Sequence, residues 1–164
     1  MEAPGCLAGR LSHLKTFATF AELAAAVGQE IAVSDWTLIT QAQVQQFADA
    51  TGDQQWIHVD VERAKAGPFG GPIAHGFLTL SLLPRLFDSS FAITESRMAV
   101  NYGLNKVRFI SPVPVGSRLR ARLKLLACTP LAEPGVQIVL EATLELEGQA
   151  RPACVAESLV RHYA

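Results

Sequence analysis

The amino-acid sequence predicts an α+β domain in which one buried helix is wrapped by a curved antiparallel sheet. Helix-like patterns fill the first half of the chain, and strand-like patterns fill the second half. Between them, residues 77–83 are almost wholly apolar, which is typical of a helix buried on most of its faces. With 164 residues, 49% of them hydrophobic and 18% charged, the chain can form one domain with a substantial core.

The composition argues against several classes of partner. The formal net charge is -1, whereas nucleic acids and anionic membranes attract basic surfaces, so we expect neither as the main partner. No apolar run reaches the roughly 18 residues that a membrane-spanning helix needs. Residues 1–14 carry an early Glu and scattered charges, which predicts a flexible leader and not a secretion signal. We therefore expect a cytoplasmic protein whose single domain spans residues 15–164.

Three short helices are predicted before the apolar segment. They are residues 20–28, 40–52 and 60–67, each ending at a glycine. In the second of them, Thr40 and Gln43 fit a capping box, and Gly52 stands where a C-terminal cap belongs. Asp53 therefore follows directly after a helix that has just ended.

The apolar helix is predicted to begin after a loop rich in glycine and proline, residues 67–72. His75 and Gly76 stand between this loop and the apolar residues. Pro84 cannot donate its backbone amide, so we expect it to kink or thin the helix near its end.

The second half of the chain alternates with a period of two, which predicts antiparallel strands with one solvated face. Basic residues occupy one face of residues 118–125, and Glu and Thr side chains occupy one face of residues 136–147. Pairing of these two strands would match opposite charges. Further strands are predicted at residues 98–110, with a bulge near Gly103, and at residues 152–163. Sheet edges of this kind are commonly covered by a second copy, so we predict a homodimer.

The stretch "TGDQQWIH" contains the first candidate for chemistry. A carboxylate and an imidazole, Asp53 and His58, can share the removal and supply of protons on one water. Gly52 lets the chain turn sharply, and Trp56 and Ile57 suggest that the turn packs inward. The alternative is that Asp53 caps a local turn and His58 is a hydrogen-bonded core histidine. The spacing alone favours this alternative.

The start of the apolar helix is the second candidate. Free amides at a helix N-terminus attract negative charge, and an amide at Gly76 could stabilise an enolate-like oxyanion. The alternative is an ordinary loop-to-helix junction, with His75 either a ligand contact or a polar group at the helix end. Ser81 is a lone polar residue in this helix, and its hydroxyl could simply bond a carbonyl one turn earlier.

Other kinds of site have little support. The three cysteines (Cys6, Cys128 and Cys154) include no CxxC pair, and the four histidines show no paired metal spacing. Motifs for nucleotide binding and for a serine nucleophile are absent. We expect no metal and no redox cofactor. Lys106, Arg108 and Arg118 could contact phosphates of a ligand or could be plain surface residues.

Two blocks of sequence together resemble the MaoC-like family of (R)-specific, type-2 enoyl-CoA hydratases. In "FADATGDQQWIHVDVERA", four features match the family's first motif, namely Phe47, the Gly52-Asp53 pair, His58 and Ala64. In "GPIAHGFLTLSLL", the letters "PIAHG" match the second block, and "NYGLNKVRFISPVPVGSRL" resembles the strand and turn that follow. The resemblance covers roughly residues 15–163. It is strongest to a bacterial subgroup that includes mycobacterial hydratases and nodulation protein N.

The resemblance implies a hotdog fold that dimerises edge to edge, and a role in fatty-acid metabolism. Asp53 and His58 would activate one water for syn addition across the double bond of a trans-2-enoyl-CoA, giving a (3R)-hydroxyacyl-CoA. The Gly76 amide would bind the thioester oxygen, with His75, Gln55 and Ser81 nearby. The acyl chain would run along the buried helix, with CoA as part of the substrate and no other cofactor.

The sequence departs from the family motif at its Asn-Pro pair, which is Gln55-Trp56 here. Gln keeps the amide donor and acceptor but adds a methylene, and Trp removes a fixed φ and adds bulk. These changes put the acyl-chain preference in question more than the reaction. The alternatives are dehydration of a (3R)-hydroxyacyl group on acyl carrier protein, thioester hydrolysis, and non-catalytic binding of acyl-CoA.

Overall fold

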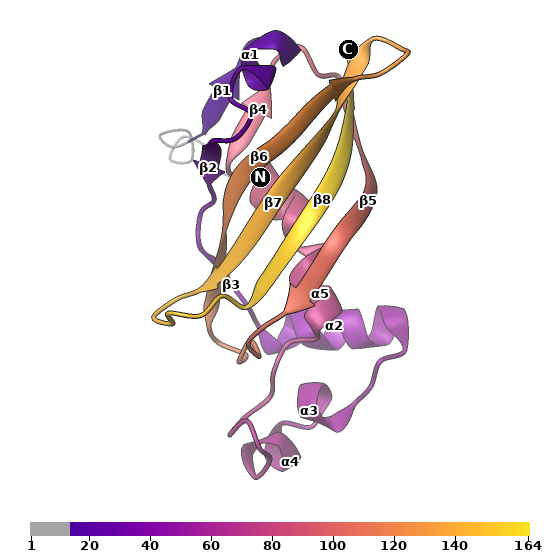
Figure 1. Cartoon of the computed structure of the whole chain (residues 1–164). Helices are drawn as coiled ribbons and strands as arrows, with labels where there is room; N and C mark the ends of the chain where they lie inside the picture. Colours follow the sequence, from indigo (N-terminus) through magenta and orange to yellow (C-terminus); the bar gives the residue numbers. More distant parts are fainter. Residues whose placement is uncertain (1–13) are drawn as a thin grey trace, which may run out of the picture.

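The computed structural model describes residues 14–164, and it has an antiparallel sheet with helices against one face (Figure 1). The strand order is β2-β6-β7-β8-β5, with β3 also paired to β6. The strands of this sheet are β2 Glu30–Val33, β3 Thr37–Leu38, β5 Met98–Phe109, β6 Arg118–Pro130, β7 Gly135–Leu146 and β8 Cys154–Tyr163. A short parallel pair, β1 Lys15–Phe17 with β4 Phe91–Ile93, was not predicted. The predicted leader lies outside the described residues apart from Leu14, as does Cys6.

The helices are α1 Phe20–Ala24, α2 Gln41–Thr51, α3 Trp56–Val59, α4 Val61–Lys65, α5 Gly76–Ser81 and α6 Leu83–Asp88. Those predicted before the apolar segment are confirmed as α1, α2 and α4, whereas α3 was not predicted. Figure 1 shows α2, α3 and α4 gathered at one end of the sheet, while α5 lies against the sheet itself. None of the helices in the described residues is long and apolar enough to cross a membrane.

The predicted single apolar helix is in fact two helices, α5 and α6, with a break at Leu82. Pro84 lies in the first turn of α6, where a missing amide costs no helical hydrogen bond. The predicted interruption near Pro84 is confirmed by this break, whereas the prediction that the helix ends close to Pro84 was wrong, because the chain is helical again to Asp88. The prediction that the apolar helix is buried on most of its faces was also wrong for one side of α5. Phe77 is 67% exposed there, and Ser81 is exposed as well.

The core lies between α5–α6 and the inward face of the sheet. The alternation in β6 and β7 is confirmed, because their inward side chains are fully buried: Leu119, Ala121, Leu123, Leu125, Ile138, Leu140, Ala142 and Leu144. On the outward face Arg120 pairs with Glu145 at 2.6 Å, as the charge pattern predicted. Such partly exposed pairs each contribute about 0–1 kcal/mol, so the apolar face accounts for most of the stability.

The strand β5 lies at one edge of the sheet and exposes large apolar side chains. They are Met98, Val100, Tyr102, Leu104 and Phe109. A register shift between Asn101 and Gly103 confirms the predicted bulge. An unpaired apolar edge is a place where another strand can add, so β5 is where we place the predicted homodimer contact.

The capping box of α2 is present, and it sets the approach of the chain to Asp53. The Gln43 amide donates to the Thr40 hydroxyl at 3.2 Å, and the Thr40 amide donates to the Gln43 side chain at 2.9 Å. Gly52 ends the helix in the left-handed region, with φ 79°.

We expect Thr40→Ala to lower the free energy of unfolding by about 1 kcal/mol, because it removes one half of the capping box. Urea unfolding followed by circular dichroism measures this change. Gln46→Ala, at an exposed position of the same helix, serves as the control and should change stability by less than about 0.5 kcal/mol. An equal loss in both variants would contradict the role of the cap.

Candidate active site

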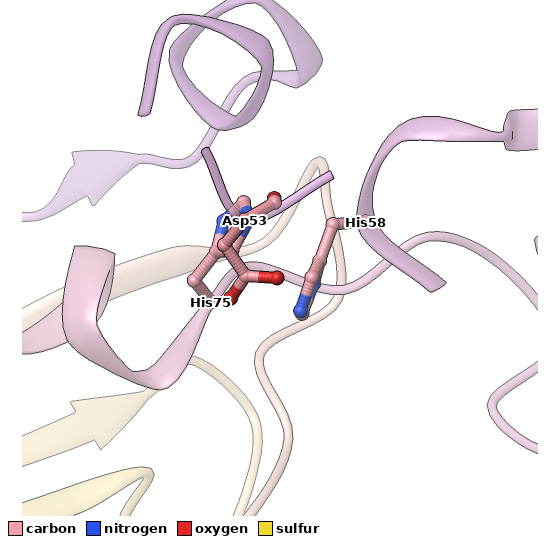
Figure 2. Close-up of side chains that lie close together, drawn as sticks. All are labelled: Asp53, His58 and His75. Carbon is pink, nitrogen blue, oxygen red and sulfur yellow. The ribbon is translucent and has the colours of Figure 1, made fainter. Parts of the chain in front are cut away.

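Three side chains from separate parts of the sequence meet at one point, namely Asp53, His58 and His75 (Figure 2). Asp53 follows the end of α2, His58 lies in α3, and His75 is the N-cap residue of α5. One polar atom of each side chain lies within 4.8 Å of the others. The two candidate regions in the sequence therefore form a single cluster.

The His58 ring is buried and held in one tautomer. Its Nδ1 lies 2.7 Å from the carbonyl oxygen of Ile73, so Nδ1 carries the proton and Nε2 is left as an acceptor. The side chain of Gln41 donates to the backbone carbonyl of His58 at 2.8 Å. Burial lowers the pKa of His58, although the hydrogen bond to Ile73 opposes this. His58 is therefore suited to accept a proton at neutral pH.

The Asp53 carboxylate is exposed and is directed toward the His58 ring (Figure 2). No described residue donates a hydrogen bond to this carboxylate; the Asp53 amide makes a long contact of 3.4 Å with the Thr51 hydroxyl. An exposed carboxylate and a buried neutral imidazole facing one point can exchange protons with a water or substrate between them.

The His75 ring contacts both Asp53 and His58 and is only 2% exposed. Its Nε2 lies 2.9 Å from the backbone carbonyl oxygen of Asp53, so Nε2 is the donor. The ring stacks on His58 with 3.8 Å between centroids and lies 5.0 Å from the ring of Phe47. The other nitrogen, Nδ1, is buried and has no hydrogen-bond partner among the described residues.

The cluster has the residue types of a metal site but an unsuitable geometry. A zinc ion needs nitrogen lone pairs that converge tetrahedrally on one point. The rings of His58 and His75 are stacked, with 28° between their planes, so their lone pairs lie in nearly parallel planes. The arrangement suits proton transfer better than metal binding.

A cavity of about 320 Å³ opens beside the cluster, with His58 and Gly76 in its wall. Asp53 and His75 do not line it. A Cβ atom added at Gly76 would lie 3.0 Å from two atoms of the Phe109 ring, so a larger residue at this position would press against this ring. Sequence reasoning missed Phe109, because its position in an exposed strand gave no sign that β5 ends beside α5.

Two further candidates, Gln55 and Trp56, lie outside this cavity. Trp56 packs against α4, with the Arg63 guanidinium 4.4 Å from the ring centroid and Gly67 beside the ring. Gln55 is exposed and makes no side-chain capping bond at the start of α3. The tryptophan therefore shapes the outside of the turn and not the cavity wall.

The structure does not bring Ser81 to the cluster. Ser81 is exposed, and its hydroxyl donates to the carbonyl of Phe77 at 2.7 Å, which is the simpler alternative for this residue. It lines a different cavity, together with Tyr102 of β5. Ser81 does not line the cavity that contains His58 and Gly76, and its implied role near the catalytic pair stays a prediction.

The family model and the similar proteins indicate the same family for this chain. Residues 22–145 match the model of the MaoC like domain. The chain is 57% identical over 151 residues to 3-hydroxyacyl-thioester dehydratase Z of Mycobacterium tuberculosis, covering 92% of this chain and all of that protein. It is 46% identical over 140 residues to nodulation protein N of Rhizobium leguminosarum, covering 84% of this chain and 87% of that protein.

Solved structures show the same fold. An R-hydratase from Pseudomonas aeruginosa superposes with a TM-score of 0.67 and 23% identity, covering 90% of this chain and 86% of that one. An (R)-hydratase from A. caviae gives a TM-score of 0.62 and 24% identity, covering 82% of this chain and 94% of that one. The extent of these matches, together with the predicted motifs, shows that the chain belongs to the MaoC-like dehydratase family, in the subgroup of the mycobacterial dehydratase and nodulation protein N.

Proposed function

We propose that the protein catalyses the (R)-specific hydration of trans-2-enoyl-CoA to (3R)-hydroxyacyl-CoA. The observation that carries the proposal is the meeting of the Asp53 carboxylate with the neutral His58 ring beside the start of α5. The names of the similar proteins, a 3-hydroxyacyl-thioester dehydratase and two R-hydratases, support this class of reaction.

In the proposed mechanism, Asp53 and His58 hold one water between them. The water oxygen bonds to C3 of the enoyl group while its proton passes to the pair, and the pair returns a proton to C2 on the same face. Negative charge develops on the thioester oxygen, where the Gly76 amide can donate because first-turn amides have no partner within their own helix. The sum is the addition of one water, with no cofactor beyond the CoA of the substrate.

The acyl chain is proposed to lie between α5–α6 and β5. The cavity that contains His58 and Gly76 lies at the first turn of α5. Two further cavities beside α6 and β5 share Pro84 and Asn101 in their walls. An acyl chain that extends beyond the reacting end of the substrate could occupy these further cavities.

The CoA phosphates are proposed to lie near Arg108. Lys106 pairs with Glu157 at 3.2 Å and Arg118 pairs with Glu147, whereas no described carboxylate pairs with Arg108. Arg108 is exposed at the end of β5 and is next in sequence to Phe109, whose ring lines the cavity that contains His58 and Gly76. Of the three basic residues considered from the sequence, Arg108 is therefore the one we assign to the ligand.

The reverse reaction, dehydration of a (3R)-hydroxyacyl thioester, uses the same groups in the opposite order. The similar mycobacterial protein is named a dehydratase, which favours dehydration as the physiological direction. Comparing CoA and acyl-carrier-protein thioesters as substrates distinguishes the two carriers.

The test is loss of the enoyl absorbance when the protein is mixed with a short trans-2-enoyl-CoA. We expect turnover, a (3R) product by chiral analysis, and no release of free thiol. Thiol release would indicate a thioesterase, and binding without turnover would indicate a non-catalytic acyl-CoA binder. Either outcome would refute the proposed hydratase.

A further inference from the structure

We propose that His75 is a positioning residue that holds both members of the catalytic pair, Asp53 through its backbone and His58 through the face of its ring. This inference rests on the proposed function of the pair. His75 is only 2% exposed, so its ring has almost no surface for a substrate to contact, and its role is to fix the reacting groups.

The hydrogen bond from His75 fixes the backbone of Asp53. Asp53 is exposed and follows a left-handed glycine, and no described residue holds its carboxylate. Its carbonyl oxygen accepts from Nε2 of His75 at 2.9 Å, across 22 residues of sequence. This bond ties the end of α2 to the start of α5, and so it sets where the carboxylate can reach.

The same short segment holds His58 from two directions. The carbonyl of Ile73 accepts the proton on Nδ1 of His58 at 2.7 Å, and the His75 ring stacks on the His58 ring at 3.8 Å. The Ile73 amide also donates to the carbonyl of Ile57 at 3.0 Å, which aligns the segment with α3. Together these contacts leave Nε2 as the acceptor of His58 and restrict rotation of its ring.

The burial of the His75 ring indicates that its polar imidazole has a role besides packing. The ring is 2% exposed, and its Nδ1 has no hydrogen-bond partner among the described residues. A buried acceptor without a partner lowers stability, whereas an apolar ring at this position, against Phe47, would not. The polar ring is therefore explained by the bond that its other nitrogen makes to Asp53.

The titratable groups that face His58 are Asp53 and His75. Burial lowers the pKa of His58, the His75 ring lowers it further, and the charge of Asp53 raises it. Removing the His75 imidazole takes away a group that lowers the pKa of His58, so we do not expect the acid limb of the kcat/KM profile to move to lower pH.

Two variants separate the two contacts of His75. His75→Phe keeps a stacked ring but has no donor for the Asp53 carbonyl, and we expect kcat to fall about 10²-fold with little change in KM. His75→Gln keeps an N–H donor, and we expect kcat to remain within about 10-fold of the unsubstituted protein. The acid limb should not move to lower pH in either variant. A His75→Phe variant with unchanged kcat, or a His75→Gln variant that loses as much kcat as His75→Phe, would overturn the proposal.

A measurement on the unsubstituted protein does not depend on how the variants fold. In ¹⁵N NMR of the histidine rings at neutral pH, His75 should carry its proton on Nε2, and His58 should carry its proton on Nδ1. A proton on Nδ1 alone of His75 would overturn the proposal, because the bond to Asp53 could not form. If the protein shows no turnover of enoyl-CoA, the proposed function fails, while the ring protonation still decides the His75 contact.

Discussion

Asp53→Asn and His58→Ala should each lower kcat/KM for a short trans-2-enoyl-CoA by about 10²-fold or more. Asn keeps the size of the side chain but cannot accept a proton as a carboxylate does, and Ala removes the imidazole whose Nε2 faces the reaction. The rate of loss of the enoyl absorbance measures both variants. Activity that survives both changes would refute the assignment of the pair.

A matched control for the first variant is Asp49→Asn, the same change four residues earlier on α2. Asp49 is held by Gln45 and Gln54 away from the cluster, so this variant should keep kcat/KM within about 2-fold. A large loss in the control would show that the effect at Asp53 comes from the fold of α2.

The pH dependence of the unsubstituted protein follows from the burial of His58. In hydration His58 must be neutral to accept a proton, so kcat/KM falls as the pH drops through its pKa. Because burial lowers this pKa from the ordinary value of 6.5, the acid limb should lie below pH 6.5. The same limb should be missing from the residual activity of His58→Ala.

Gly76→Ala should lower kcat/KM by about 10²-fold, because a Cβ at this position meets the Phe109 ring at 3.0 Å. If the ring moves into the cavity it takes space from the substrate, and if the start of α5 moves away it displaces the amide proposed to bind the thioester oxygen. The double variant Gly76→Ala with Phe109→Ala should recover a large part of the loss, because the clash is removed.

The control for this substitution is Gly71→Ala, in the loop before α5. A Cβ at Gly71 meets no atom within 4 Å, so this variant should behave as the unsubstituted protein in the same assay. If Gly76→Ala keeps full activity, the Phe109 ring accommodates the Cβ and the predicted effect of this contact on the site is wrong. If the Phe109→Ala change restores nothing, the loss comes from α5 and not from the clash.

Features set by neighbouring residues could be predicted from the sequence. The alternation in β6 and β7, the capping box of α2 and the bulge near Gly103 depend on contacts between residues close in sequence or on one repeated period. The pairing of basic and acidic strand faces followed from the same alternation. The family motif similarly indicated Asp53 and His58, which are five residues apart.

Features set by packing between distant segments could not be predicted in this way. The continuation of the helix from Leu83 to Asp88 and the exposure of Ser81 depend on how α5 and α6 lie against the sheet. Phe109 reaches Gly76 only because β5 ends beside α5.

The sequence by itself determined the class of fold, the positions of most elements and the residue types available for acid–base chemistry, because each of these depends on local patterns. Only the tertiary structure decided how those residues meet. It brought the His75 ring, 22 residues after Asp53, between the backbone of Asp53 and the face of His58. A hydrogen bond to a backbone carbonyl and a stacked ring have no signature in sequence spacing, since both depend on where the folded chain returns.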